Sequence, residues 1–370
     1  MPTQLTNTQI LEYVTGGKTH AGYQDTVKLY TDLKVHIDGE YPKDIIEAAR
    51  PNEPAHIKEY RQQIFAHTTM PVCSKVITSL SKIRKSHDWN IKFKDESVPK
   101  IIATAETPKQ YFNYGFPIFG SITTWAFNVF LKQYLTDPNA VIVTMPMKWN
   151  LAANEYFKPF PFIFNSPDVI ELVDNDYAVV RSTENVGTKY GIRNVFYVIT
   201  TMDFQKWMPN DSKEGYYMAE QLVHNTGSLP AWRVGGLGYK VVDKTFLWKS
   251  RIYPMVPFLN EAAREFSDLQ AAVVQHLFLE RWELEGPKCK ICQGTGKVKK
   301  GERSIKCTNE DCNKGAIMGN PYRPIILRKG LPGEQAPTVP AGYIDKNPEI
   351  IKIQDERVDK HYFKALAAIN

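Results

Sequence analysis

The stretch PFLNEAAREFSDLQAAVVQHLFLERWEL, from Pro257 to Leu284, carries the clearest helical periodicity in this chain of 370 residues. Apolar side chains return every three or four positions, as they do in an amphipathic helix that packs one side against a core. Gly286 and Pro287 follow and predict the end of the helix. The apolar stripe consists of Leu259, Ala262, Phe266, Leu269, Val273, Leu277 and Leu284.

The remaining surface of this predicted helix is acidic. Arg264 and Arg281 are its only bases, and a solvated face is the simplest interpretation of the excess of carboxylates. Glu280 differs from the others because it interrupts the apolar stripe, where it either ends the close packing or meets a partner. The candidate partner-facing acids are Glu261, Glu265, Asp268, Glu280 and Glu283.

Four of the five cysteines follow this helix within a window of 24 residues, spaced C-x2-C-x14-C-x4-C. The spacing is typical of two knuckles that hold one tetrahedral zinc ion, and four thiolates close the coordination sphere, so we predict structural Zn2+. Iron is the alternative metal. Two disulfides or four unrelated thiols are less favoured, because we expect no signal peptide and Cys73 is left unpaired. The predicted ligands are Cys289, Cys292, Cys307 and Cys312.

The cysteine segment also holds most of the net positive charge. The whole chain has 46 Lys and Arg against 40 Asp and Glu, and residues 286–315 contain eight bases and three acids, which leaves 38 against 37 elsewhere. A basic knob on a nearly neutral body indicates contact with phosphate or with an acidic protein surface, although solvated lysines give the same pattern. The candidate contact residues are Lys288, Lys290, Lys297, Lys299, Lys300, Arg303 and Lys306.

The rest of the chain reads as α+β. Ile57 to Lys85 predicts two helices, or one helix kinked at Pro71, and Thr107 to Leu135 predicts a further helix rich in aromatic residues. A last helix begins at the predicted cap Asn347 and runs to Ile369.

The middle third of the chain predicts a mostly antiparallel sheet with an aromatic face that forms a core or a subunit contact. Asp174–Asp176 predicts a hairpin turn, and the glycine run Val234–Gly238 predicts a turn before a strand. The expected strands are Lys100–Ala105, Ala140–Met145, Pro161–Asn165, Val169–Val173, Tyr177–Arg181, Val195–Thr201 and Tyr239–Lys249.

Several short motifs, in this order, resemble the portal proteins of tailed bacteriophages. They are Arg50-Pro51-Asn52-Glu53 with Tyr60-Arg61, then His224 to Pro230, then Pro257 to Phe278 with Ser267-Asp268. The resemblance implies a mixed α/β wing (1–250), a first stem helix (251–286), a small clip with the zinc ribbon (287–343) and a second stem helix (344–370). Family members continue into a tunnel loop and a crown after the second stem helix, so either this sequence is a fragment or those parts are absent. A zinc ribbon in the clip is not a general feature of portals.

The resemblance also implies a structural, non-catalytic function. A portal is a structural protein that forms a ring, usually a dodecamer, at one capsid vertex of the virion. A terminase drives double-stranded DNA through the ring during DNA packaging, and the DNA leaves through it during DNA ejection. Expected partners are terminase, the major capsid protein and a neck or adaptor protein of the head-tail connector. DNA passes without sequence specificity, assembly takes place in the host cytoplasm, and the acidic stem residues are expected at the channel wall or the subunit seam.

Two other classes of function are weaker alternatives. The sequence contains no Walker loop, no His-Glu-x2-His and no Gly-x-Ser-x-Gly, so we predict that the protein is not an enzyme. The repeat Cys289 to Gly296 resembles the CxxCxGxG knuckle of J-domain co-chaperones, which implies a zinc ribbon that binds nucleic acid or protein and has no virion role. No apolar segment reaches the roughly 20 residues that a membrane span needs.

Overall fold

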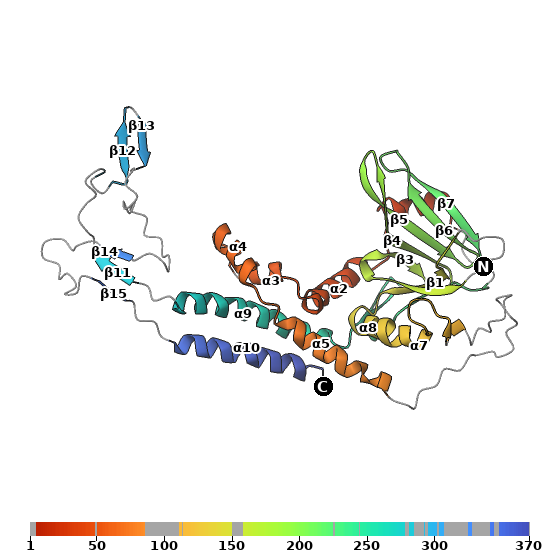
Figure 1. The fold of residues 1–370 in the computed structure, drawn as a ribbon. Coiled ribbons are helices and arrows are strands. Elements are labelled where there is room, and N and C mark those ends of the chain that lie inside the picture. The colour runs from red at the N-terminus through yellow and green to blue at the C-terminus, as the bar shows by residue number, and fades with distance from the viewer. Residues whose placement is uncertain are drawn as a thin grey trace. The chain divides into compact units, whose positions relative to one another are not determined.

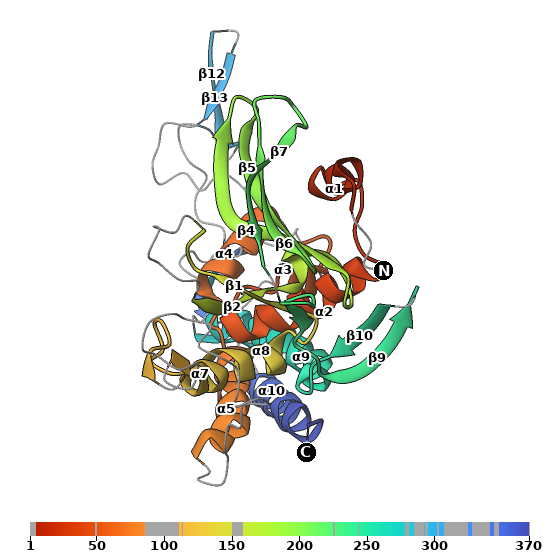
Figure 2. The ribbon, with the colours of Figure 1, turned by 90° about the vertical axis from the view of Figure 1, so that its right-hand side faces the viewer.

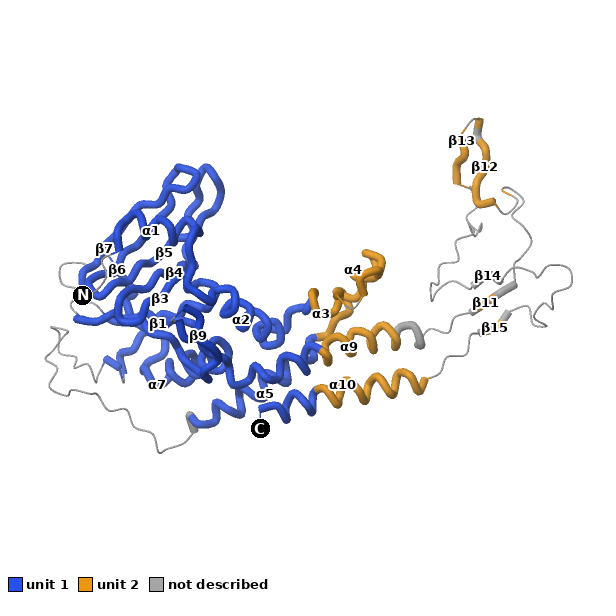
Figure 3. Tube along the Cα trace, turned by 180° about the vertical axis from the view of Figure 1, so that it is seen from behind, with its two compact units in different colours: residues 1–42, 67–260, 362–370 blue, residues 43–66, 261–361 orange. Residues whose placement is uncertain are grey.

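The computed structural model describes residues 5–48, 50–85, 111–112, 114–149, 158–224, 226–243, 245–277, 281–284, 292, 295–301, 303–306, 325–327, 341–343 and 348–369. The chain has the mixed α+β fold that the sequence predicts, and its five-stranded sheet is antiparallel (Figure 1). Unit 1 comprises residues 1–42, 67–260 and 362–370, and unit 2 comprises residues 43–66 and 261–361 (Figure 3). Within the described ranges, no helix is both long and apolar enough to cross a membrane.

Unit 1 is built around a five-stranded antiparallel meander (Figure 2). The predicted turn at Asp174–Asp176 is confirmed, since Asn175 has a left-handed φ of 62° and the amide of Asp176 donates to the carbonyl of Val173 at 3.0 Å. The three predicted strands are present, two of them longer than predicted, and the last two strands were not predicted. In order of pairing, the strands are β3 (Val169–Val173), β4 (Tyr177–Thr188), β5 (Gly191–Thr200), β6 (Asp203–Pro209) and β7 (Tyr216–Val223).

Apolar side chains cover both faces of this meander. Because side chains alternate along a strand, Ala178 and Val180 of β4 point to one face and Val179 to the other, and all three are fully buried. One face packs against a second antiparallel sheet, ordered β2 (Pro159–Phe164), β1 (Val141–Pro146) and β8 (Ala231–Arg233). The other face packs against α1 (Asn7–Val14), whose start is fixed by a capping box at Thr6.

One predicted strand of unit 1 is wrong. Tyr239–Lys249 is not a single strand but the larger part of a hairpin of β9 (Leu237–Val242) and β10 (Thr245–Lys249). Asp243 has a left-handed φ of 43° and reverses the chain between the two strands. The predicted turn in the glycine run is confirmed, because Gly235 has a φ of 82° and β9 begins two residues later.

The aromatic residues before the sheets form a core. α7 (Ile122–Trp125), a π-helical turn (Ala126–Phe130) and α8 (Leu131–Thr136) make one continuous helical stretch. Trp125 packs with Tyr111, Phe116 and Phe160 in a buried aromatic cluster. The predicted strand Lys100–Ala105 lies outside the described residues.

The helices of unit 1 share a separate core. Leu33 of α2 (Tyr23–Asp38) and Cys73 of α5 (Thr69–Leu80) are buried with Leu259 and Ala365. A 3-10 turn (Ser81–Lys85) follows α5. Two helices are present in this region, as one of the two predicted alternatives had it, namely α4 (Ala55–Ile64) and α5. The break between them precedes Pro71, so the prediction that Pro71 marks it is wrong. Pro71 lies in the first turn of α5, where a missing N–H costs no hydrogen bond.

Unit 2 contains α3 (Lys43–Ala48), α4 (Ala55–Ile64) and most of α9 (Val256–Leu277). The prediction that this last helix extends to Leu284 is wrong, because Arg281–Leu284 forms β11. β11 lies between β14 (Ile325–Leu327, parallel) and β15 (Ala341–Tyr343, antiparallel). The ring of Trp282 lies against Gly342, so a side chain at that position would collide with the indole.

The second long helix is present where the sequence predicts it. α10 spans Glu349–Ala367, and its predicted apolar stripe includes the buried residues Val358 and Ala365. The predicted cap Asn347 lies outside the described residues. Between the two long helices, β12 (Lys297–Lys300) and β13 (Arg303–Lys306) form an antiparallel hairpin.

Candidate functional site

A buried charge network in unit 2 joins residues that are far apart in the sequence. Arg61 of α4 is only 3% exposed. Its guanidinium donates from Nε to Oε1 of Glu53 at 2.8 Å and from Nη1 to Oδ1 of Asp268 at 3.2 Å. Nη1 also donates to the carbonyl and the hydroxyl oxygen of Ser267, at 3.0 and 2.9 Å. A buried guanidinium is tolerated when carboxylates and hydrogen bonds satisfy it in this way.

Arg50 closes the network at its exposed side. Its Nη2 contacts Oδ1 of Asp268, and its Nη1 lies 3.6 Å from Oε1 of Glu53. Two bases therefore share two carboxylates, and the group is neutral overall. The segments that carry the portal resemblance at Arg50–Glu53, at Arg61 and at Ser267–Asp268 thus meet at one place. The predictions treated Asp268 as a partner-facing acid and missed both of its bases.

A second set of polar contacts joins α9 to α10 within unit 2. Arg357 donates from Nη2 to Oε1 of Glu265 at 2.6 Å, and Nε2 of His361 lies 3.6 Å from the same oxygen. The side-chain amide of Gln354 donates to the carbonyl of Glu265 at 3.4 Å. In unit 1, Leu259 shares a core with Ala365. Residues earlier in α9 therefore meet residues later in α10, so the two helices run antiparallel.

These contacts correct the expected solvated acidic face. Glu265 and Asp268 retain side-chain exposures of 12% and 27%, and both pair with bases of the same chain. Glu261 pairs with Arg264 at 3.1 Å and is 41% exposed. Helical periodicity detects acids along one helix but not bases that come from elsewhere in the chain. Of the remaining predicted acids, Glu280 lies outside the described residues and the side chain of Glu283 is not described.

The third motif, His224 to Pro230, forms a tight turn in unit 1. The imidazole of His224 lies 3.1 Å from the carbonyl of Thr200 and packs on Phe204 with ring centroids 4.6 Å apart. Gly227 has a φ of 69°, and Thr226 donates to the carbonyl of Ser228 at 2.7 Å. The hydroxyl of Thr226 also lies 2.9 Å from Nδ1 of His224, and these contacts together fix a turn between β7 and β8.

The described part of the cysteine segment contains a knuckle-like turn. Cys292 is 5% exposed, and its carbonyl accepts from the amide of Thr295 at 3.0 Å. Gly296, which follows, has a left-handed φ of 69°, as a knuckle turn requires. The described residues contain no cluster of three or more metal-ligating side chains, and three of the four predicted ligands, Cys289, Cys307 and Cys312, lie outside them. A set of four thiolates fits Zn2+ chemically, and the zinc site stays a prediction.

The predicted basic residues divide into two groups. Lys297, Lys299, Arg303 and Lys306 are exposed on the β12–β13 hairpin, and Lys300 belongs to the same hairpin. Lys288 and Lys290 lie outside the described residues. The structure therefore brings five of the seven candidate bases onto one small element.

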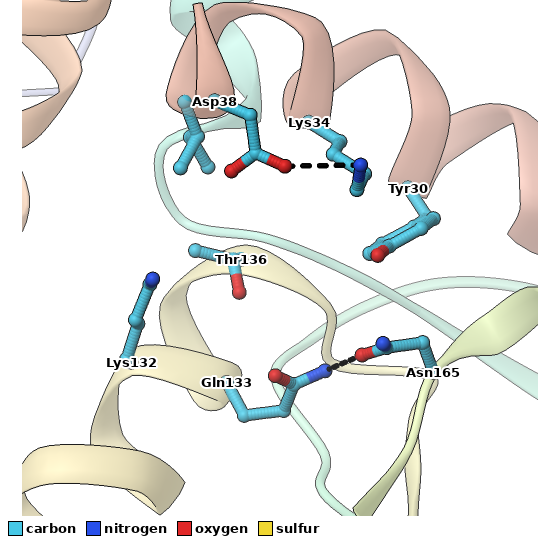
Figure 4. Close-up of a pocket in the computed structure, with 8 residues that line it drawn as sticks. Tyr30, Lys34, Asp38, Lys132, Gln133, Thr136 and Asn165 are labelled. Atoms are coloured by element: carbon cyan, nitrogen blue, oxygen red, sulfur yellow. Dashed lines mark hydrogen bonds and ion pairs between the residues drawn. The ribbon is translucent and has the colours of Figure 1, made fainter. Parts of the chain in front are cut away.

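A pocket of about 220 Å3 in unit 1 lies between α2 and α8 (Figure 4). Lys34 pairs with Asp38 at 3.0 Å and with Glu40 at 3.1 Å. Hydrogen bonds that the amine donates to both carboxylates raise the pKa of Lys34 and favour its protonated form. Gln133 donates to Asn165 at 2.6 Å across the opposite wall.

A larger cavity of about 430 Å3 in unit 1 lies beside β4 and β6. Its two bases are neutralised by neighbours, since Arg181 donates to Asp168 at 2.9 Å and Lys206 pairs with Glu184 at 2.7 Å. The hydroxyl of Tyr197 donates to the same Glu184 at 2.6 Å. These groups satisfy one another and leave no activated nucleophile among the residues that line the cavity.

Comparison with known proteins gives no assignment: no protein-family model matches the chain, and no curated protein matches it.

Proposed function

We propose that this chain is a portal protein, which forms a ring at one capsid vertex and provides the channel for packaging and ejection of double-stranded DNA. The observation that carries the proposal is the antiparallel pair α9 and α10, with the cysteine and lysine segment between them. The pair fits the two stem helices of a portal. The residues before α9 fit the wing, and residues 287–343 fit the clip.

The charge network supports the same assignment. Arg61 fixes Ser267 and Asp268 of α9 to the segment that begins at Arg50, and these are the residues that resemble portal motifs. A ring that passes DNA needs a stem of fixed geometry, and a buried ion-pair network restricts alternative packings of α9. A structural zinc ion would stiffen the clip, which is too small to build a core of its own.

The acidic residues of α9 and β11 are not equally good candidates for the channel wall or the subunit seam. Glu261 is partly exposed, and with Glu280 and Glu283 it remains a candidate for the channel wall or the subunit seam. Glu265 and Asp268 already neutralise Arg357, Arg50 and Arg61 within the chain. They can serve a neighbouring subunit only by exchanging these partners.

Assembly tests the proposal. Negative-stain images and mass photometry of the purified chain should show annular particles with about twelve times the mass of the 42.3 kDa chain. Glu261→Arg should weaken or alter the ring, whereas the same reversal at the exposed Glu12 of α1 should leave it unchanged. A chain that stays monomeric at all concentrations and salt levels would contradict the portal assignment.

One observation favours a second candidate, a zinc ribbon that binds nucleic acid or protein without a virion role. The β12–β13 hairpin carries several exposed bases, and such a hairpin could bind a partner without the chain forming a ring. Binding by a dispersed monomer would favour this candidate, and annular particles would favour the portal.

A further inference from the structure

The β12–β13 hairpin has one face made almost entirely of lysine. The register pairs Lys297 with Lys306 and Lys299 with Ser304. Directly opposite residues share a face, and so do residues two apart along a strand, so all four side chains lie on the same side of the hairpin. Lys297 and Lys299 are separated by roughly 7 Å along the strand, and Lys306 lies about 5 Å across from Lys297.

This lysine face is destabilising when it stands alone. Like charges directly opposite each other in a sheet repel, and the Lys297–Lys306 pair is of this kind. Both side chains are exposed, and within the described residues no carboxylate forms an ion pair with Lys297, Lys299 or Lys306. Gly301, with a φ of 67°, supplies the tight turn that holds the two strands in register. The fold thus maintains a cluster of positive charge that an anionic partner would relieve.

Other features of the hairpin indicate which kind of anionic partner fits it best. Its sequence, from Lys297 to Lys306, contains no aromatic residue, so it offers no platform on which single-stranded bases could stack. Lysine is depleted at protein–protein interfaces, and a face of one sign without apolar anchors is unlike their cores. Lysine binds phosphate as a point charge, and a two-stranded ribbon is narrow enough to lie against the major groove of B-form DNA.

We propose that the face formed by Lys297, Lys299, Lys306 and Ser304 binds the phosphate backbone of duplex DNA without sequence specificity. Phosphates along a strand neutralise the opposed lysines and remove their repulsion. Contacts to phosphate carry no sequence information, so affinity should not depend on sequence. This inference does not require the portal assignment, because the hairpin would bind DNA in a ring or as a single chain.

Fluorescence anisotropy with a labelled 30-base-pair duplex of mixed sequence tests the proposal. With full-length protein and a series of salt concentrations, changing Lys297, Lys299 and Lys306 together to Gln should reduce the slope of log K against log salt by about 2.7, or 0.9 for each lost phosphate contact. The contribution of the three lysines to affinity should fall roughly 40-fold between 50 and 200 mM salt. Changing the exposed lysines Lys75, Lys82 and Lys213 to Gln is the matched control and should leave the slope unchanged.

A variant that gains DNA affinity is needed as well, because the lysine-to-glutamine variant could lose affinity simply by misfolding. Ser304→Lys places a fourth base opposite Lys299, and it should tighten binding and steepen the slope by about 0.9. Poly-glutamate of equal charge serves as a competitor that mimics an acidic protein surface. The proposal is overturned if poly-glutamate competes better than unlabelled duplex, if the lysine variant keeps the wild-type slope, or if Ser304→Lys has no effect. If these tests fail while the chain still forms rings, the DNA-binding proposal is wrong and the portal assignment stands. If the hairpin binds DNA but the chain forms no rings, the DNA-binding proposal stands and the portal assignment is wrong.

Discussion

Replacement of Arg61 by Met should release α4 from α9. Arg61 makes four hydrogen bonds, two of them to carboxylates, from a side chain that is 4% exposed. Removal of one partner of a buried ion pair costs about 3–5 kcal/mol. Arg50 still neutralises part of the charge on Glu53 and Asp268, so we expect the lower end, about 3 kcal/mol. Methionine fills most of the same volume and limits the additional cost of a cavity.

Hydrogen exchange followed by mass spectrometry measures this change. A loss of about 3 kcal/mol corresponds to roughly a hundredfold faster exchange for amides of α4 (Ala55–Ile64) that exchange by local opening. Arg50→Met is the matched control. Its side chain is 35% exposed, so its loss should cost no more than about 1 kcal/mol, or about fivefold in exchange. Equal effects of the two variants, or unchanged protection of α4 in Arg61→Met, would show that the buried network does not hold this helix.

Two further predictions concern a metal and a buried acid. Purified protein should contain about one zinc ion per chain by elemental analysis, and Cys292→Ser should reduce that content sharply, because a closed tetrahedral site tolerates the loss of a thiolate poorly. Burial raises the pKa of Asp137 to about 6 from 3.8 despite hydrogen bonds from Ser166, so the folded state holds this proton more tightly than the unfolded chain. The free energy of unfolding should therefore decrease by about 2 kcal/mol between pH 4 and pH 6 through this group. Urea titrations should show that Asp137→Asn removes this component, and an identical pH profile for the two proteins would contradict it.

The strands that the sequence predicted share a simple property. In β1 and β3 to β5, runs of β-branched and aromatic residues are bounded by turn residues, and burial confirms that they pack in a core. β6 was missed because its alternation breaks: the register shifts between Lys206 and Trp207, so the period of two does not persist along the strand. β7 was missed because it is an edge strand with no fully buried position and no apolar face to detect.

The end of α9 shows the limit of helical periodicity. Leu284 continues the apolar stripe by spacing, yet Arg281–Leu284 is a strand. Its backbone bonds with β14 and β15 come from segments that follow by at least 40 residues, and Trp282 covers the glycine at position 342. Tertiary pairing therefore overrides a local pattern that is too short to decide between helix and strand.

The candidate site was predictable only in part. The basic hairpin could be expected from composition, because five bases lie within ten residues and Gly301 marks the turn. The pairing of Asp268 with Arg61 could not be expected from the sequence, because the two residues are about 200 positions apart and neither local sequence specifies the contact. Motif resemblance named both residues without showing that they touch.

The distribution of paired and unpaired bases links the two proposals. A base that is already neutralised by a carboxylate releases few counterions on meeting DNA, so it adds little salt-dependent affinity and little drag. In unit 2, Arg50, Arg61 and Arg357 are all neutralised in this way. Lys297 and Lys306 of the hairpin have no such partner among the described residues. If the chain forms a DNA channel, these three arginines should therefore contribute little to contact with phosphate, and the lysine-to-glutamine variant of the hairpin should lose DNA affinity while its rings remain intact.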